Sequence, residues 1–263
     1  MTSALDTLLR NRHVLHAARG ASDWVDLQLS DLLRQLREIA PRTHGKLLDV
    51  GCGEKPYEPI FLPYVTEYIG VEYEQAFKNT YSSSRSSKPD VYYDGNVLPF
   101  ESGSFDTVLS MQVLEHTPHP QRLVDEMARV VKKGGIVIAS APFSFRIHEA
   151  PHDYFRYTPN GLRSMFESSG LVVDGIWNGR DLWSVVGHKI NSYLAFRVAR
   201  IEAIAQSIGK HGHEDVRTAP VRYWTLPFVL PTMGAISAAS RFLDRIAPDG
   251  TEALSYLIFG HPR

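Results

Sequence analysis

The sequence predicts an α/β fold in which helices flank a mostly parallel β-sheet. Two observations lead to this prediction. Short apolar runs alternate along the chain with stretches of helical periodicity, and such alternation is typical of strand–helix–strand units with right-handed crossovers. The first apolar run also leads directly into a loop that contains two glycines. With 263 residues, 43% of them hydrophobic, the chain is long enough to bury a substantial core.

Seven short apolar runs are expected strands, because buried strands of parallel sheets read as nearly continuous hydrophobic segments. They cover residues 46–50, 68–72, 91–93, 105–111, 135–140, 171–177 and 253–259. An amphipathic helix is expected over 22–40, before Pro41. A second helix is expected over 121–131, and Gly134 and Gly135 should end it.

The expected organisation has four parts. Residues 1–45 form an N-terminal helical cap, 46–180 the ligand-binding core, 181–250 a helical insertion, and 251–263 the last strand of the core. The insertion is inferred because about 70 residues between two strands is far longer than an ordinary connection.

Two segments of the chain have an unusual composition. The serine-rich residues 81–89 are expected to form a polar loop. Within the insertion, residues 182–208 are apolar and periodic, and Pro227 and Pro231 interrupt the apolar window that follows. We expect a buried helix over 232–246, with a peripheral membrane contact through 223–246 as the alternative.

Composition excludes several classes of protein. The formal net charge of −1 gives no global attraction to nucleic acids or anionic membranes. The single cysteine, Cys52, excludes an intrachain disulfide and a multi-cysteine zinc cluster. Asp6, Arg10 and Arg12 stand where a signal peptide would need an apolar core, so we expect a cytoplasmic protein.

The segment Leu47 to Tyr57, LLDVGCGEKPY, is the strongest local signal for a ligand site. The strand ends in Asp49, and glycines follow where a backbone must approach a ligand closely. Glu72 closes the next strand, at the spacing expected for an acidic residue that binds ribose hydroxyls. Pro56 occupies the third glycine position of a dinucleotide fingerprint, and a carboxylate before the loop suits an ammonium better than a diphosphate.

A third acidic residue, Asp94, ends the third strand and could accept a hydrogen bond from an adenine amine. The three carboxylates should lie along one edge of the sheet, at the carboxyl ends where ligands bind in open α/β sheets. A helix cap or a solvated turn would explain any one of these residues, but three in register favour a ligand site.

The sequence resembles the class I S-adenosylmethionine-dependent methyltransferases, in the subgroup with D-x-G-C-G, LPF-x-x-x-SFD and LEH motifs. These motifs stand here at residues 49–53, 98–106 and 114–116, and Lys132-Lys133-Gly134-Gly135 completes the pattern. The match departs from the family at Gly53-Glu54-Lys55-Pro56-Tyr57, where the third glycine of G-x-G-x-G is missing.

The resemblance implies a seven-stranded Rossmann-like sheet whose last strand is antiparallel, with S-adenosylmethionine as the cofactor. Asp49 and the loop glycines would hold its methionine part, Glu72 the ribose, and Asp94 with Gly95 the adenine. The cofactor-binding residues we expect are Asp49, Gly51, Cys52, Gly53, Tyr57, Glu72, Asp94, Gly95, Met111 and Gln112. The insertion 181–250 would then be a lid or wall for the methyl acceptor.

The segment after the fifth strand, residues 148–158, supplies the candidates for the acceptor side. We expect His152 or His148 to act as a base, oriented by Asp153, because histidine titrates near neutral pH. His116 follows the fourth strand and could flank the methyl group. Tyr154, Arg156 and Tyr157 are candidates for binding the acceptor, although each of the latter two could equally tie the loop down.

Residues 148–152 also spell the zinc-protease pattern H-E-x-x-H. That pattern needs a helix, and Pro151 inside it disfavours one, so we expect no protease and no metal ion. A divalent cation held by His148, His152 or Asp153 stays open as an alternative.

The leading expectation is O-methylation of a sugar, a glycan intermediate or a natural-product small molecule. A nicotinamide-dependent oxidoreductase and a non-catalytic S-adenosylmethionine-binding partner protein are the alternatives. No nucleic-acid partner is expected, because the fourth strand leads into Ser110-Met111-Gln112-Val113 and not into the Asp/Asn-Pro-Pro-aromatic element of base methyltransferases.

Overall fold

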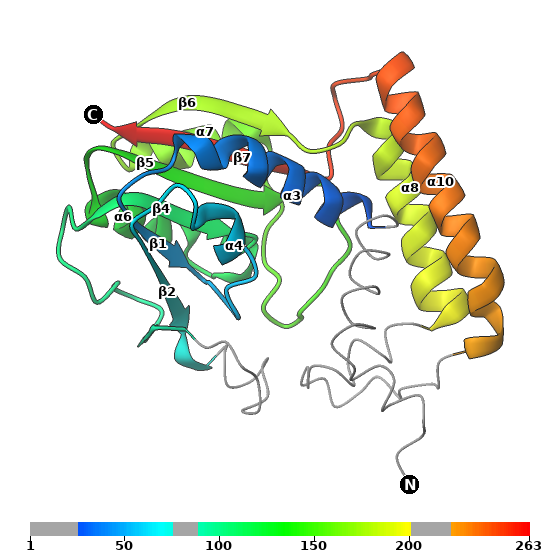
Figure 1. The fold of residues 1–263 in the computed structure, drawn as a ribbon, viewed down its shortest axis with the longest axis horizontal. Helices are drawn as coiled ribbons and strands as arrows, with labels where there is room; N and C mark the ends of the chain where they lie inside the picture. Colours follow the sequence, from blue (N-terminus) through cyan, green and yellow to red (C-terminus); the bar gives the residue numbers. More distant parts are fainter. Residues whose placement is uncertain (1–25, 76–88, 201–221) are drawn as a thin grey trace, which may run out of the picture.

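A single seven-stranded sheet forms the centre of the protein (Figure 1), as a computed structural model that describes residues 26–75, 89–200 and 222–263 shows. The strand order is β3-β2-β1-β4-β5-β7-β6, and β7 runs antiparallel to both of its neighbours while the other pairs are parallel. The strands are β1 Lys46–Val50, β2 Glu67–Tyr73, β3 Val91–Tyr93, β4 Phe105–Met111, β5 Val131–Pro142, β6 Leu171–Asn178 and β7 Ser255–Pro262. The predicted fold class, with its antiparallel last strand, is confirmed.

Helices cover both faces of the sheet. Two clusters of buried side chains form the core, one on each face of the sheet. In one, Leu32 and Leu36 of α3 pack with Leu109 and Phe259 of the sheet, and Met127 of α6 belongs to the other. Phe166 of α7 belongs to the same cluster as Met127. The helices are α3 Leu27–Ile39, α4 Glu58–Phe61, α6 Pro120–Val130, α7 Pro159–Ser168, α8 Leu182–Tyr193 and α10 Leu226–Ile246. Short 3-10 turns are η1 Ala40–Arg42, η2 Leu114–His116 and η4 Tyr223–Thr225, and η3 Leu194–Ala199 is a π-helical turn.

Strand β5 and helix α10 both begin earlier than predicted. Strand β5 begins at Val131 and not at 135, because Val131 already pairs with Phe105 and a register shift follows. Helix α10 begins at Leu226, six residues before the expected start at 232. Pro227 lies in its first turn, where a proline costs no hydrogen bond, and Pro231 is tolerated inside the helix.

The insertion forms a hairpin of α8 and α10 that stands beside the sheet (Figure 1). Asn191 of α8 donates to the carbonyl of Met233 at 3.2 Å and to the hydroxyl of Ser237 at 2.8 Å. The hairpin also touches the loop after β5. The Phe145 and His188 rings lie 5.1 Å apart, and the Arg146 guanidinium lies 4.1 Å above the Phe196 ring. The predicted lid or wall therefore adjoins the loop that carries the candidate bases, while its role stays a prediction.

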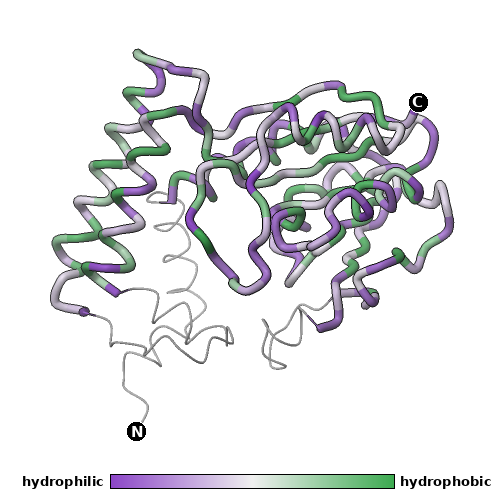
Figure 2. Tube along the Cα trace, turned by 180° about the vertical axis from the view of Figure 1, so that it is seen from behind, coloured by the Kyte–Doolittle hydropathy of each residue, from purple (hydrophilic) through white to green (hydrophobic). Residues whose placement is uncertain are grey.

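The buried helix expected over 232–246 is only partly buried, so that prediction is wrong. The segment Tyr223–Ile246 is long and apolar enough to span a membrane, and only 28% of its most apolar window is buried inside the protein. One face packs on α8, and Trp224 and Phe228 on the other sides are 74% and 73% exposed. Figure 2 shows apolar positions recurring along the hairpin.

Three predicted segments fall wholly or partly outside the described residues. These are residues 1–25 of the N-terminal cap, 81–88 of the serine-rich connection, and 201–208 of the apolar stretch.

Candidate active site

The glycine loop turns back onto β2 directly after β1. The amides of Gly51 and Cys52 donate to the carbonyl of Val71 at 2.9 and 3.2 Å. Gly51 has φ +74°, and a Cβ there would lie 2.4 Å from a methyl group of Val113. Both the left-handed backbone and the close approach therefore require glycine at this position.

Lys55 occupies the position where the family pattern has its third glycine. It adopts φ +54°, so the turn is made without glycine. Its ammonium lies 3.0 Å from both carboxylate oxygens of Asp90, and its side chain is 11% exposed. We infer that this ion pair, in which Lys55 is mostly buried and Asp90 is exposed, helps offset the backbone strain of a left-handed non-glycine residue.

Glu72 joins the glycine loop to the end of β2. One carboxylate oxygen accepts a hydrogen bond from the Gly53 amide at 2.7 Å, and the other accepts from the Tyr73 amide at 2.9 Å. Burial raises the pKa of Glu72, against the effect of these two hydrogen bonds. The residue predicted to bind ribose thus lies beside the loop predicted to bind the methionine part.

Asp49 is almost completely buried at the end of β1. Its carboxylate accepts a hydrogen bond from the Tyr68 hydroxyl at 2.6 Å. Burial raises the pKa of Asp49 to about 7, although the Tyr68 hydrogen bond acts in the opposite direction. A cation placed beside this group would favour its ionised form, which suits the predicted contact with an ammonium.

Asp94 and Gly95 lie at the exposed end of the same edge, after β3. One Asp94 oxygen accepts from the Asn96 amide at 2.9 Å, and the hydrogen bonds from Asn96 lower the pKa of Asp94. Gly95 has φ +83°, and a Cβ there would lie 3.3 Å from the Tyr73 ring. The structure therefore brings the buried Asp49 and the partly buried Glu72 together with the glycine loop in one cradle and leaves Asp94 at the exposed end of the same edge.

Met111 ends β4 on the other side of the loop, and Gln112 follows it. The Gln112 amide nitrogen donates to the Ser140 hydroxyl at 3.1 Å, and its oxygen accepts from Gln28 of α3 at 3.0 Å. The Ser140 hydroxyl also lies 3.4 Å from the sulfur of Met111. Gln28 is a site residue that the sequence analysis missed, since only the folded chain brings α3 to this edge.

Cys52 and Tyr57 complete the predicted set of cofactor-binding residues. A Cβ on Gly70 would lie 2.6 Å from the Cys52 sulfur, which places that thiol against β2. Any contact of Cys52 with a cofactor is then more readily made by its backbone than by its thiol. Burial raises the pKa of Tyr57, and the charges of Asp49 and Glu115 raise it further.

A cluster of imidazoles and carboxylates adjoins this cradle, where η2 meets the loop after β5. The rings of His116 and His148 are 4.7 Å apart, and one Glu115 oxygen lies 3.7 Å from Nε2 of His116. The Tyr154 amide donates to the Glu115 carbonyl at 2.8 Å, which holds the loop on η2. Glu115 was not predicted as a site residue, although it stands in the L-E-H motif beside His116.

Asp153 orients His148 and not His152. Its carboxylate accepts from the His148 amide at 2.8 Å and lies 3.4 Å from Nδ1 of that ring. Hydrogen bonds from Arg156 and His148 outweigh burial and lower the pKa of Asp153 to about 2. Burial lowers the pKa of His148. His152 is exposed, and its Nδ1 lies 3.1 Å from the Tyr154 hydroxyl.

Arg156 and Tyr157 hold the loop in place, which is the alternative that the sequence left open, while binding of the acceptor by either residue stays a prediction. The guanidinium of Arg156 donates to both Asp153 oxygens at 2.6 and 2.8 Å and to the carbonyl of Arg146 at 2.8 Å. The Tyr157 hydroxyl donates to the carbonyl of Leu114 at 2.9 Å. Tyr154, by contrast, is 44% exposed and stays a candidate.

The H-E-x-x-H residues 148–152 form no helix, as Pro151 predicts. The geometry that a zinc protease requires from this motif is therefore absent from this described segment.

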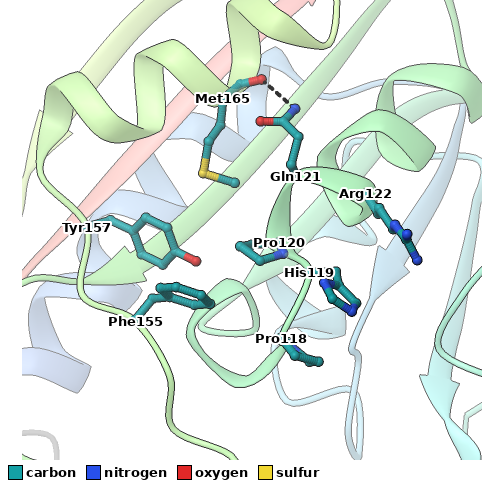
Figure 3. A pocket seen from close by; sticks show the side chains of 8 residues that line it. All are labelled: Pro118, His119, Pro120, Gln121, Arg122, Phe155, Tyr157 and Met165. Carbon is teal, nitrogen blue, oxygen red and sulfur yellow. Dashed lines mark hydrogen bonds between the residues drawn. The ribbon is translucent and has the colours of Figure 1, made fainter.

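A separate hollow lies on the outer side of η2 and the start of α6 (Figure 3). Phe155 and Met165 form part of its wall, and Gln121 closes it by donating to the carbonyl of Met165 at 3.1 Å. None of the predicted cofactor-binding residues lines it.

Comparison with known proteins identifies a domain within the chain. Residues 48–139 match the family "Methyltransferase domain". An uncharacterized methyltransferase of Mycobacterium sp. (strain JLS) is 36% identical over 112 residues, which cover 43% of this chain and 44% of the relative. The matched region thus spans less than half the length of that relative.

Solved structures support the fold. The [4+2]-cyclase SpnF has a TM-score of 0.53 at 18% identity, over 89% of this chain and 81% of that one. An S-adenosylmethionine-dependent methyltransferase from Mesorhizobium loti has a TM-score of 0.50 at 14% identity, over 87% and 96% of the two chains. Because a cyclase shares the architecture, the fold alone does not specify the reaction.

The match over residues 48–139 confirms the expected methyltransferase domain, and the solved structures agree with it in fold. S-adenosylmethionine is the cofactor that this domain implies. The residues present fit that cofactor. The glycine loop, in which a Cβ at Gly51 would collide with Val113, lies beside the buried carboxylate of Asp49 and the partly buried carboxylate of Glu72. The roles assigned to individual residues stay predictions.

We predict that Gly51→Ala weakens cofactor binding through its clash with Val113. Gly103→Ala is the matched control, because Gly103 also has a positive φ, of +64°, but nothing lies within 4 Å of the added Cβ. Both variants should lose about 1–2 kcal/mol of stability to backbone strain. Only Gly51→Ala should lose more than about tenfold in affinity for S-adenosylhomocysteine in calorimetric titration, about 1.4 kcal/mol. Equal affinities in the two variants would contradict the cradle.

The raised pKa of Asp49 predicts a pH-dependent affinity for the same ligand. An ammonium binds a carboxylate and not a carboxylic acid, so affinity should fall as the pH drops below about 7. We expect binding about tenfold weaker at pH 6 than at pH 8, and a much flatter profile for Asp49→Asn. Tyr68→Phe should move the midpoint to higher pH, because it removes a hydrogen bond that favours the carboxylate. A flat wild-type profile would show that Asp49 does not bind the ammonium.

Proposed function

We propose that this protein is a cytoplasmic methyltransferase that transfers a methyl group to a hydroxyl oxygen of a sugar, a glycan intermediate or a natural-product small molecule. The observation that carries the proposal is the adjacency of the cofactor cradle and the imidazole cluster. Glu149, beside His116, is close enough to Glu72 for its charge to raise the pKa of Glu72. The charge of Glu115 likewise raises the pKa of Tyr57.

The cofactor, when bound, supplies an activated methyl group, so the chain has to align the acceptor and accept its proton. His148 suits the second task. Burial lowers its pKa, which keeps the imidazole neutral near pH 7, and Asp153 lies 3.4 Å from its ring. His116 lies beside His148, whereas His152 is exposed and is therefore the weaker candidate for the base.

The aromatic surroundings favour a ring-shaped acceptor. Phe145 lies between His148 and His188, at ring distances of 5.0 and 5.1 Å. Aromatic side chains in such a wall can stack on the apolar face of a sugar or on a planar ring. The acceptor class is inferred from this wall and from the position of the hairpin beside it.

Replacing Glu72 by Gln tests the proposed cofactor site. Glu72→Gln keeps the size of the side chain but removes the charge and one acceptor oxygen. We expect wild-type protein to bind S-adenosylhomocysteine at micromolar concentration and the variant to bind it about 1–3 kcal/mol more weakly in calorimetric titration. Glu74→Gln, two residues further along the chain and exposed, should bind as the wild type does.

The same titration with NADH and NADPH separates the alternatives. Clear dinucleotide binding without S-adenosylhomocysteine binding would overturn the proposal in favour of an oxidoreductase. Binding of S-adenosylhomocysteine without transfer of labelled methyl from S-adenosylmethionine to any sugar or phenolic acceptor would favour a non-catalytic partner protein.

We also propose that the α8–α10 hairpin makes a peripheral contact with an anionic membrane. The exposed side chains of this hairpin include Trp183, Tyr193, Tyr223, Trp224, Phe228, Phe242 and Ile246. Its described residues carry six basic side chains, at Lys189, Arg197, Arg200, Arg222, Arg241 and Arg245, against one acidic side chain, Asp244. Exposed aromatics with an excess of basic charge are typical of helices that lie in a membrane interface.

Vesicle sedimentation tests this contact. We expect wild-type protein to sediment with vesicles that contain phosphatidylglycerol, and to do so less with phosphatidylcholine alone. The double variant Trp224→Ala/Phe228→Ala should lose most of the bound fraction, while Tyr64→Ala, which removes an exposed aromatic far along the chain from the hairpin, should not. Wild-type protein that stays in the supernatant with both vesicles would contradict the contact.

A further inference from the structure

Glu115 is a buried carboxylate without a hydrogen-bond partner for its side chain among the described residues. Its side chain is fully inaccessible to solvent, and neither carboxylate oxygen has a hydrogen-bond partner among the described residues. Burying such a group unpaired is costly. A partner that the protein chain itself does not provide would explain why the residue is placed there.

Two imidazoles converge on the same point. Glu115, His116 and His148 each offer one ligand atom, and these atoms all lie within 4.8 Å of one another. Oε1 of Glu115 lies 3.7 Å from Nε2 of His116. Metal–ligand bonds of about 2.0–2.2 Å would require only a small contraction of the cluster.

The groups around the two imidazoles orient them as the outer partners of metal ligands do. Nδ1 of His116 lies 2.7 Å from the carbonyl oxygen of His152, so it can donate there and leave Nε2 with its lone pair towards Glu115. The Asp153 carboxylate lies 3.4 Å from the His148 ring and is itself held by Arg156. Glu149 adds a second carboxylate, 3.9 Å from Nε2 of His116.

We propose that Glu115, His116 and His148 bind a divalent first-row transition-metal ion beside the methyl-transfer site. Imidazole nitrogens with one carboxylate suit Zn²⁺, Mn²⁺, Fe²⁺ or Co²⁺, whereas Mg²⁺ and Ca²⁺ prefer sites made of oxygens alone. Three protein ligands leave positions open, and an acceptor hydroxyl bound at one of them would be held in place for methylation. With the ion bound, His148 would be a ligand and not the base, and the exposed His152 would be the candidate that accepts the proton of the acceptor. That role of the ion rests on the proposed function, but binding of the ion does not.

The experiment is a titration of the full-length protein, stripped with EDTA, with Co²⁺ and with Mn²⁺. We expect one ion per chain at micromolar concentration, with a visible Co²⁺ absorption that reports nitrogen and oxygen coordination. Glu115→Gln and His148→Ala should each weaken binding by at least tenfold. His152→Ala should leave metal affinity unchanged, because its ring is outside the cluster and its backbone carbonyl is retained.

Binding of S-adenosylhomocysteine by each variant is measured in parallel. Variants that keep this binding but lose the metal ion support the proposal, whatever the enzyme's activity proves to be. Wild-type protein that binds no ion, or that binds it as tightly after His148→Ala as before, overturns it. If Glu115→Gln fails to fold, His148→Ala decides the question, because His148 lies on a loop and not in the core.

Discussion

The hydrogen bond from the Gly53 amide to the Glu72 carboxylate is the interaction on which the site depends. It joins the glycine loop after β1 to the end of β2, so the two segments that would hold the methionine and ribose parts of the cofactor are positioned together. Because one Glu72 oxygen binds the loop and the other binds the Tyr73 amide, the carboxylate is oriented before any ligand arrives. Preorganisation of this kind reduces the entropy lost on binding.

The acceptor side is organised by a second network, centred on Asp153. Arg156, Asp153 and His148 form a chain of hydrogen bonds and ion pairs within one loop, and the Tyr157 hydroxyl and the Tyr154 amide tie that loop to η2. The fold thereby brings His148 beside His116 although 32 residues separate them in the chain. The hairpin of α8 and α10 adds a wall through Phe196 and His188.

The sheet could be predicted from the sequence because each strand is a short apolar run with polar residues or glycines on either side. The start of β5 could not, since Lys132, Lys133 and two glycines resemble a turn, while Lys132 is in fact paired with Asp106 at 2.9 Å. The sequence also did not show that α10 has an exposed face. An apolar composition does not distinguish a helix that is buried on all sides from one that packs on one face only.

For the site itself, the sequence predicted a cofactor edge from its glycines and acidic residues, and the structure brings Asp49 and Glu72 together there. The sequence did not identify Glu115, whose burial exists only once the loop after β5 folds over η2. The sequence also could not show which of His148 and His152 lies beside Asp153. Their spacing would place them on one face only in a helix, and Pro151 disfavours a helix there. Arg156 likewise is of a residue type that often binds ligands, but in the structure its guanidinium donates hydrogen bonds to Asp153 and to the carbonyl of Arg146 in the same loop.

Amide hydrogen exchange with and without S-adenosylhomocysteine tests the central claim most directly, namely that the carboxyl edge of β1, β2, β3 and β4 holds the cofactor. The account predicts protection confined to residues 49–57, 72–75, 93–97 and 111–116, with little change in α7 and β6. Protection centred on another region, or no protection at ligand concentrations well above the dissociation constant, would contradict it.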